Sequence, residues 1–311
     1  MPEWRIEAGI GETRLVLVEG GEIIEARIQR EGVIAAGSVL DARLVATGRL
    51  SLARADGKEY LLPKGAPGVA EGAALTIEVT REQLAGAEPW KRPLARVSDQ
   101  AARAAPVVEG RALVFPAPDD PLEALGWSDL LDEGRSGVIG FVGGELRVSL
   151  TPAMTLIDVD GYLPAEALAL AGAQAAARVI RRHAITGSIG IDLPTCRGKA
   201  VRQAVAEAVD AVLPQPFERT AVNGFGFLQI VRPRRHASLF ELAADRAAFE
   251  ARALLRRAAR EHGALTLVAA PALLAAIDPA WLGRLGAQVG GAIGLRAEPS
   301  LAMAGGYAQR A

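Results

Sequence analysis

The sequence predicts a mixed α/β (α+β) protein with a small β-barrel near its N-terminus. Short β segments dominate residues 4–97, a strand, long helix and strand follow one another over residues 154–193, and helices and strands alternate again over residues 246–297. Half of the 311 residues are apolar, so the chain can bury a large core, and at ~150 residues per domain it is long enough for about two folding units.

The N-terminal third reads as β structure. Residues 13–18 form a strand that ends at Glu19-Gly20-Gly21-Glu22, a hairpin-type turn, and residues 23–28 return with an alternating pattern. From about residue 37 to 97, short strands with turn residues between them and little helical periodicity favour a small β-barrel. Residues 106–120, rich in Pro, Ala and Asp, are typical of a linker.

The clearest periodic pattern follows this linker. Strands are expected at 154–159 and 188–193, each followed by a helix, at 165–183 and 199–213. A strand, a long helix and a second strand imply parallel pairing through a right-handed crossover. A hairpin around Asn223-Gly224 is then expected to join residues 217–223 and 227–232. The remaining expected elements are helices at 246–261 and 271–285 and strands at 265–269 and 292–297.

Composition excludes several classes of protein. Lys and Arg total 35 against 36 Asp and Glu, so bulk charge does not indicate nucleic-acid binding. The single cysteine, Cys196, excludes a disulfide framework, and three scattered histidines cannot build a Cys/His zinc site. There is no signal-peptide pattern at the start, and the longest apolar run, residues 265–277, is shorter than the ~20 residues of a membrane span. We therefore expect a cytoplasmic protein with no membrane partner.

Two aspartates are the main candidates for chemistry. Asp158 and Asp192 both stand at the carboxyl ends of expected strands, where open α/β sheets bind their ligands. If the strands are neighbours, ~4.8 Å apart, the carboxylates share one crevice and could hold Mg²⁺ against a phosphodiester. The alternative is that both are ordinary strand-end or helix-capping residues. Asp160 is either a turn former or an auxiliary ligand of the same ion.

Basic and aromatic residues that follow these aspartates in the sequence have two interpretations each. The helix start at Arg197, Lys199 and Arg202 could contact phosphate or be a solvated face. The cluster of Arg232, Arg234 and Arg235 could hold an RNA backbone or be a charged loop. Phe225 and Phe227 could stack on a base or belong to the core. We read Cys196 as a small buried filler.

Nucleotide hydrolases and serine hydrolases are not indicated. The glycines of residues 134–144 lack the Gly-Lys-Ser/Thr of a P-loop, and no dinucleotide fingerprint or serine-centred triad motif is present.

Three landmarks occur in a recognisable order. The chain reads Ala-Met-Thr-Leu-Ile-Asp-Val-Asp-Gly at 153–161, Gly-Ser-Ile-Gly-Ile-Asp at 187–192, and Phe-Gly-Phe-Leu-Gln at 225–229. In order and spacing, residues 140–240 resemble the ribonuclease E/G family. Residues 12–16 match it more weakly, and residues 265–271 resemble its small C-terminal domain.

This resemblance implies an RNase H-like catalytic domain with an embedded S1-like (OB) β-barrel. Asp158 and Asp192 would be the Mg²⁺ ligands, with Asp160 in support and Mn²⁺ as a substitute ion, and the reaction would be endonucleolytic cleavage of single-stranded RNA. The implied domains are N-terminal strands completing the RNase H-like domain (1–34), the barrel (35–98), a linker or vestigial sensor region (99–125), the catalytic domain (126–240) and a small C-terminal α/β domain (241–311).

The chain also departs from the family pattern. Asp160 stands where the family has Asn, and Thr195 where it often has a further Asp. No Cys-Pro-x-Cys pair follows His236, so we expect no zinc and no zinc-linked dimer. The barrel lacks the expected stacking phenylalanines and leaves Tyr60 as the candidate. The segment that would carry a 5′-phosphate sensor is short and has no Arg-Thr pair.

The sequence therefore predicts a short Mg²⁺-dependent endoribonuclease in which Arg197, Lys199 and Arg202 position phosphate. Two alternatives remain open at this point. One is a catalytically impaired RNA-binding protein of the same fold, and the other is a metal nuclease of the same type that acts on DNA.

Overall fold

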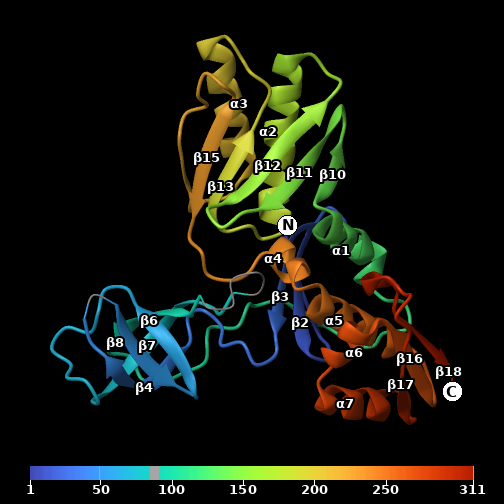
Figure 1. Cartoon of the computed structure of the whole chain (residues 1–311). Coiled ribbons are helices and arrows are strands. Elements are labelled where there is room, and N and C mark those ends of the chain that lie inside the picture. The colour runs from blue at the N-terminus through green and yellow to red at the C-terminus, as the bar shows by residue number, and fades with distance from the viewer. Residues whose placement is uncertain (49, 85–90, 311) are drawn as a thin grey trace. The chain divides into compact units, whose positions relative to one another are not determined.

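The computed structural model describes residues 1–48, 50–84 and 91–310 and shows a mixed α+β fold with a closed β-barrel and several separate sheets (Figure 1). The chain divides into two compact units. The first joins Met1–Glu31, Gly110–Ser136 and Leu239–Ala311, and the second joins Gly32–Glu109 and Gly137–Ser238. Both units are therefore discontinuous in sequence. Among the described helices, none combines the length and apolar character needed to cross a membrane.

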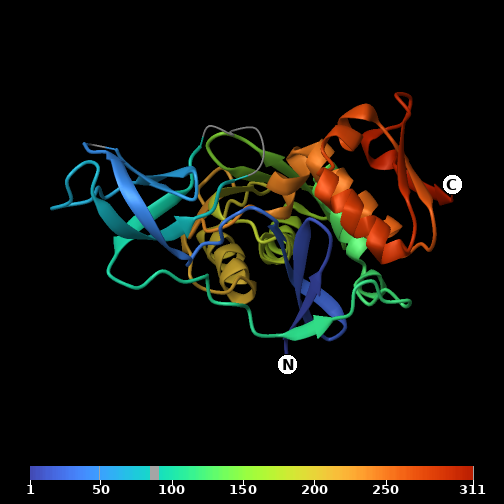
Figure 2. The same cartoon turned by 90° about the horizontal axis from the view of Figure 1, so that it is seen from below.

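The first unit begins with a four-stranded sheet in the order β3-β2-β1-β9, built from β1 (Glu3–Ala8), β2 (Glu12–Glu19), β3 (Glu22–Arg30) and β9 (Arg111–Leu113). The expected hairpin is confirmed, and its turn uses Gly20 and Gly21, both with positive φ. β9 lies inside the segment expected to be a linker and pairs parallel to β1, beside which Figure 2 shows it. These four strands form a sheet separate from the six-stranded sheet described below.

The rest of the first unit is α/β. Its sheet has the order β17-β16-β18, with β16 (Leu265–Ala269) central, β17 (Ile293–Ala297) parallel to it and β18 (Tyr307–Arg310) antiparallel. The helical segments are α1 (Trp127–Ser136), α4 (Leu239–Ala244), α5 (Arg246–Ala258), α6 (Pro271–Ala275), α7 (Pro279–Val289) and the short 3₁₀ turns Glu123–Leu125 and Met303–Gly305.

The helix expected over residues 271–285 is two helices. Pro279 occupies the first turn of α7, where its missing N–H costs nothing, and the side chain of Asp278 caps that turn by accepting a hydrogen bond from the Ala280 N–H at 2.8 Å. The chain therefore ends α6 at Ala275 and restarts at Pro279.

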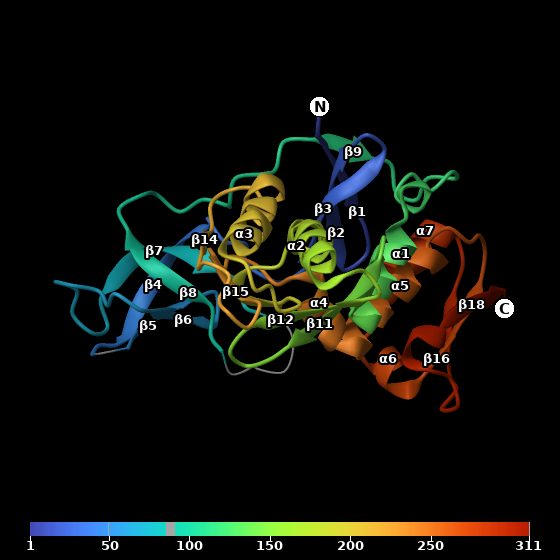
Figure 3. The ribbon, with the colours of Figure 1, turned by 90° about the horizontal axis from the view of Figure 1, so that it is seen from above.

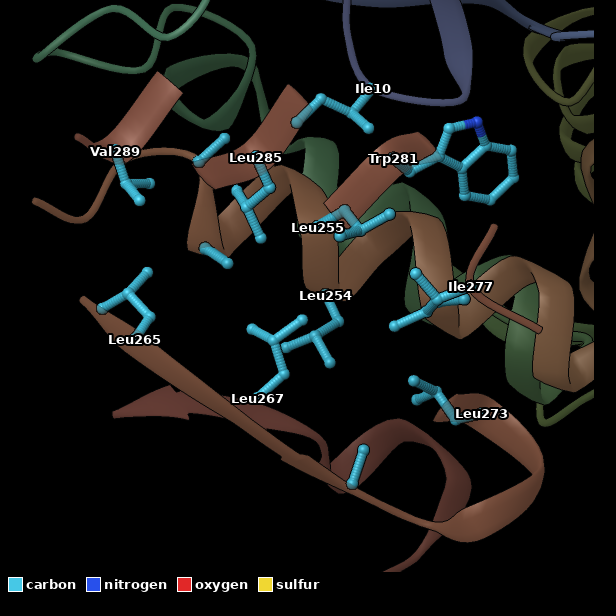
Figure 4. Packing of buried hydrophobic residues seen from close by; sticks show 14 residues of the cluster. Ile10, Leu254, Leu255, Leu265, Leu267, Leu273, Ile277, Trp281, Leu285 and Val289 are labelled. Atoms are coloured by element: carbon cyan, nitrogen blue, oxygen red, sulfur yellow. The ribbon is translucent and has the colours of Figure 1, made fainter. Parts of the chain in front are cut away.

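The core of this α/β part lies between α5, α7 and β16. Figure 4 shows Leu254 and Leu255 of α5, Leu265 and Leu267 of β16, and Leu285 of α7 directed into one apolar space. All five are fully buried, and at about 25 cal/mol per Å² of apolar surface such burial is the main stabilising contribution to the fold.

The expected barrel is present in the second unit. β4 (Val39–Ala46), β5 (Ser51–Ala55), β6 (Lys58–Leu62), β8 (Leu94–Ser98) and β7 (Ala74–Arg81) close in that order, since β7 pairs back with β4. This order is consistent with an OB-like barrel. Leu44, Leu62 and Ile77 fill its interior and are completely buried.

The second unit also holds a six-stranded sheet in the order β10-β11-β12-β13-β15-β14. Its strands are β10 (Val138–Phe141), β11 (Gly144–Leu150), β12 (Thr155–Gly161), β13 (Gly187–Asp192), β14 (Glu218–Arg219) and β15 (Phe227–Arg232). The parallel pairing of β12 with β13 is confirmed, and α2 (Ala165–Arg182) connects them. The hairpin of β10 and β11 was not predicted, and β14 is much shorter than expected.

Helices cover one face of this sheet. α2 and α3 (Lys199–Val212) lie side by side on it, as the views in Figures 1 and 3 agree. Ile157, Ile189 and Ile191 point to that face and are completely buried. Because side chains alternate along a strand, Asp158 and Asp192 belong to the opposite face.

Candidate functional site

The two aspartates are direct neighbours in the sheet. The parallel register pairs Asp158 of β12 with Asp192 of β13, at the carboxyl end where β13 stops. Register partners on adjacent parallel strands point to the same face, and the strands lie about 4.8 Å apart. Asp192 is exposed and Asp158 partly so. The fold therefore brings together the two carboxylates that the sequence singled out.

The negative charges of Asp158 and Asp192 repel each other, and Asp160 adds a third negative charge nearby. Burial raises the pKa of the Asp158 carboxyl, and the negative charges of Asp160 and Asp192 raise it further. The backbone N–H of Val159 and the charge of Arg147 act in the opposite direction without cancelling the effect. The net shift is upward, so a cation placed at this position would relieve the repulsion.

Asp160 belongs to the strand and not to a turn. It pairs with Glu145 of β11, and β12 continues to Gly161, so the turn-former interpretation of Asp160 is wrong. Its carboxylate is exposed on the face that carries Asp158. Over the described ranges 1–48, 50–84 and 91–310, no group of three or more His, Cys, Asp or Glu side chains is arranged to hold a metal ion. Asp160 is therefore not placed as a third direct ligand.

The donor set nevertheless fits Mg²⁺. This ion is bound through one or two protein carboxylates, and water and substrate phosphate complete its octahedron. One exposed and one partly exposed carboxylate, in register at the end of β13, supply that number of ligands and leave room for the rest. The set does not fit structural zinc, which takes four ligands rich in Cys and His.

The loop after β13 carries the expected basic residues. Arg197 and Lys199 are exposed there, and Lys199 begins α3. Arg202 is partly buried, and its Nη1 donates to the carbonyl oxygens of Cys196 at 3.0 Å and Arg197 at 3.1 Å and so ties the loop to the helix. Cys196 is buried as expected, and burial raises the pKa of its thiol.

The turn before β15 lies next to Asp192. Phe227 is the register partner of Asp192, and the Leu193 N–H donates to the Gly226 carbonyl at 3.2 Å. Asn223 Oδ1 holds the turn by accepting from the N–H groups of Phe225 and Phe227. Phe225 is 84% exposed, whereas the Phe227 ring covers the space above Gly190, where an added Cβ would lie 2.5 Å from it. Only Phe225 of the two is free to stack on a ligand.

The basic cluster lies at the other end of the sheet. β15 runs antiparallel to β13, so Arg232 pairs with Gly187 and not with Asp192. Five residues of strand, at about 3.4 Å each, separate the two ends by roughly 17 Å. Arg232 donates to the Ile185 carbonyl, and Arg234 packs against Gly187. Arg232 is therefore remote from the aspartate pair, and an RNA contact by Arg232, Arg234 and Arg235 stays a prediction.

Tyr60 is also misassigned. Its side chain is 1% exposed and belongs to the interior of the barrel, where β6 alternation directs it inward together with Leu62. A base cannot stack on a ring that is already enclosed. Burial raises the pKa of its hydroxyl.

The sequence analysis missed Arg147 and Glu145, because it predicts no strand between residue 120 and residue 154. The signal was present. Polar Glu145, Arg147 and Ser149 alternate with Leu146, Val148 and Leu150, as in a half-buried strand that follows a glycine turn. Arg147 is the register partner of Asp158 on β11. It belongs to the same face as the aspartate pair.

No protein-family model matches this chain, and no curated protein matches it significantly. The resemblance to the ribonuclease E/G family therefore depends on the three motifs and their order alone.

Proposed function

We propose that this protein is a Mg²⁺-dependent endoribonuclease that cleaves single-stranded RNA. The observation that carries the proposal is the direct register of Asp158 and Asp192 on adjacent parallel strands, at the carboxyl end of the sheet. In open α/β sheets this end is where ligands bind. Two ionised carboxylates at this end of the sheet repel each other, and the raised pKa of Asp158 is consistent with that repulsion. Hard divalent ions bind to carboxylate pairs of this kind.

Separate residues would bind the ion, the RNA backbone and a base. Asp158 and Asp192 hold the ion, and Asp160 adds negative charge beside it without being a direct ligand. Arg197 and Lys199, exposed on the loop after Asp192, hold the RNA backbone, and Phe225 offers a base-stacking surface. When bound, Mg²⁺ supplies a Lewis acid that polarises the phosphoryl group. Water would attack phosphorus and one P–O ester bond would break; the water oxygen would stay on the phosphate, and one of its protons would end on the released hydroxyl.

Two family-level features belong to the same proposal. The six-stranded sheet with its paired aspartates is assigned to an RNase H-like catalytic domain, and the five-stranded barrel to an S1-like RNA-binding module. Their support is the sequence order of the three motifs and the strand order of the barrel.

The test is cleavage of a labelled single-stranded RNA by purified protein with Mg²⁺, Mn²⁺ or EDTA. We expect cleavage with either ion and none with EDTA. Asp158→Asn and Asp192→Asn should each lower the rate at least ~10³-fold, because each removes one of two ionic ligands. Asp119→Asn, the same change at an exposed carboxylate of the first unit, is the matched control and should retain activity.

The outcomes separate the alternatives. RNA binding without cleavage would assign a catalytically impaired RNA-binding protein. Cleavage of single-stranded DNA in preference to RNA would assign a DNA nuclease. Full activity in either aspartate variant would overturn the assignment of the site.

A further inference from the structure

Arg147 has a position that the aspartate pair alone does not explain. It lies on β11 directly across from Asp158, and residues directly opposite in an antiparallel pair have Cβ atoms about 5 Å apart on one face. Its side chain is 59% exposed, so a ligand bound at the aspartates can reach it.

The guanidinium is held in place by a neighbour other than the aspartates. Arg147 Nε and Nη2 donate to Glu145 Oε1 at 2.9 and 2.6 Å. Within the described residues Arg147 makes no ion pair with Asp158, and its Nη1 has no hydrogen-bond partner. Glu145 therefore fixes the guanidinium beside the aspartates and leaves three of its five N–H donors available.

The local charge indicates what those donors bind. Asp158, Asp160, Asp192 and Glu145 carry four negative charges on this face, and a phosphodiester adds a fifth. A divalent cation at the pair offsets two of them. Arg147 supplies a further positive charge on the same face, and a guanidinium matches phosphate oxygens in geometry as well as charge.

We propose that Arg147 binds the phosphate at the aspartate pair, with Glu145 as its positioning residue. This inference rests on the proposed function for the identity of the substrate. It gives a function to β11, a strand that the sequence analysis does not predict.

The experiment compares Arg147→Ala, Arg147→Lys and Glu145→Gln with the parent protein. Loss of a charge-assisted phosphate contact should lower kcat/KM about 10- to 100-fold in Arg147→Ala. Lysine keeps the charge without the fork and should restore part of that loss. Glu145→Gln should raise KM about 3-fold or more and change kcat less, since it loosens the group without removing it.

A second readout does not depend on cleavage. RNA affinity is measured by filter binding in EDTA across a salt series, where each phosphate contact to a single strand contributes about 0.7 to the slope of log K against log salt. Arg147→Ala should reduce that slope by about this amount. The matched control is Arg27→Ala, because Arg27 is tethered to Glu25 in the same i−2 arrangement on a different sheet. It should leave both readouts unchanged.

The results distinguish a failure of the role proposed for Arg147 from a failure of the proposed endoribonuclease function. If the parent protein cleaves RNA and Arg147→Ala cleaves and binds equally well, the role of Arg147 is wrong and the proposed function stands. Undiminished cleavage that reaches its half-maximal rate at a lower Mg²⁺ concentration in Arg147→Ala would make Arg147 a competitor of the ion and would also overturn the inference. If no cleavage occurs but the salt slope falls, the proposed function fails while the phosphate contact is retained.

Discussion

At the scale of single residues, the site is built at the expense of stability. Burial raises the pKa of Asp158 and two carboxylates add to the effect, so the folded state binds a proton there more tightly than the unfolded state does. The ionised carboxylate therefore destabilises the fold at neutral pH. This cost is absent at low pH, where the group is protonated in both states, and it develops as the pH rises from the unfolded to the folded pKa.

The first prediction follows from that sign. In EDTA at pH 7, Asp158→Asn should raise the melting temperature by roughly 1–3 °C, because it removes the like-charge repulsion. The gain should shrink as the pH is lowered. Mg²⁺ should then raise the melting temperature of the parent protein and not that of the variant. The measurement is thermal unfolding followed by circular dichroism at several pH values.

Asp210→Asn is the control of opposite sign. A side-chain hydrogen bond from Arg219 lowers the pKa of Asp210, so the same chemical change should lower the melting temperature there. A melting temperature that falls equally in both variants would contradict the electrostatic account of Asp158.

At the scale of elements, the turn of residues 223–226 fixes the side of the site next to Asp192. Gly226 has φ +96°, and a Cβ at this position would lie 2.1 Å from the Leu193 carbonyl oxygen. Only glycine satisfies both the backbone conformation and the close approach. The turn therefore holds Phe225 and Phe227 beside Asp192 by backbone packing.

The second prediction compares two glycine substitutions. Gly226→Ala should destabilise the second unit by about 3 kcal/mol or more, since backbone strain and a backbone clash add, and it should lower cleavage. Gly57→Ala, at a barrel turn with φ +73° and open space around it, should cost only the strain of about 1–2 kcal/mol. Urea unfolding of both variants provides the comparison, and equal losses would mean that the contact with Leu193 is not limiting.

Elements with strong periodicity were predictable. The β12-α2-β13 unit, the hairpin of β2 and β3 and the barrel follow the expected ranges closely, because buried alternation and helical spacing are local signals. Asp158 and Asp192 could be paired in advance for the same reason, since both stand near the carboxyl ends of strands that one helix joins. The break at Asp278-Pro279 was also encoded locally, as a cap and a proline, but the apolar run around it obscured the signal.

Other features depend on pairing between distant segments and could not be read locally. β9 has only three residues and forms because β1 has a free edge. Tyr60 was taken for an exposed aromatic, since one-residue alternation in a short strand does not reveal which face closes into a barrel. The position of Arg232 also depends on strand pairing, because the antiparallel register of β15 with β13 carries it to the end of the sheet opposite Asp192.

At the scale of the whole molecule, a buried ionic cluster holds together segments of the first unit that are far apart in sequence. Glu7 of β1 accepts from Arg14 of β2 at 2.7 Å and from Arg256 of α5 at 3.0 Å, and Arg256 also donates to Asp120 at 2.6 Å. These residues come from segments as far apart as residues 7 and 256. The cluster thus links the N-terminal sheet, the segment before α1, and α5. Burial by itself raises the pKa of Asp120, but hydrogen bonds from Arg256 outweigh it and hold the pKa below its usual value.

The last prediction uses this shift. Because the folded pKa of Asp120 is lowered, its contribution to stability is fully present above the unfolded pKa of about 3.9 and is lost as the pH falls through the folded value. Asp120→Asn should therefore destabilise the first unit by about 1–3 kcal/mol at pH 7, the cost of leaving a buried guanidinium short of one charged partner. Below about pH 4 the difference in unfolding free energy between Asp120→Asn and the parent protein should narrow.

Tryptophan fluorescence during urea unfolding suits the measurement, since Trp4, Trp127 and Trp281 all belong to the first unit. RNA cleavage, which depends on the second unit, serves as the control and should change little in native buffer. If Asp120→Asn and the parent protein differ by the same amount at pH 7 and pH 3, the cluster does not stabilise the unit through the charge of Asp120.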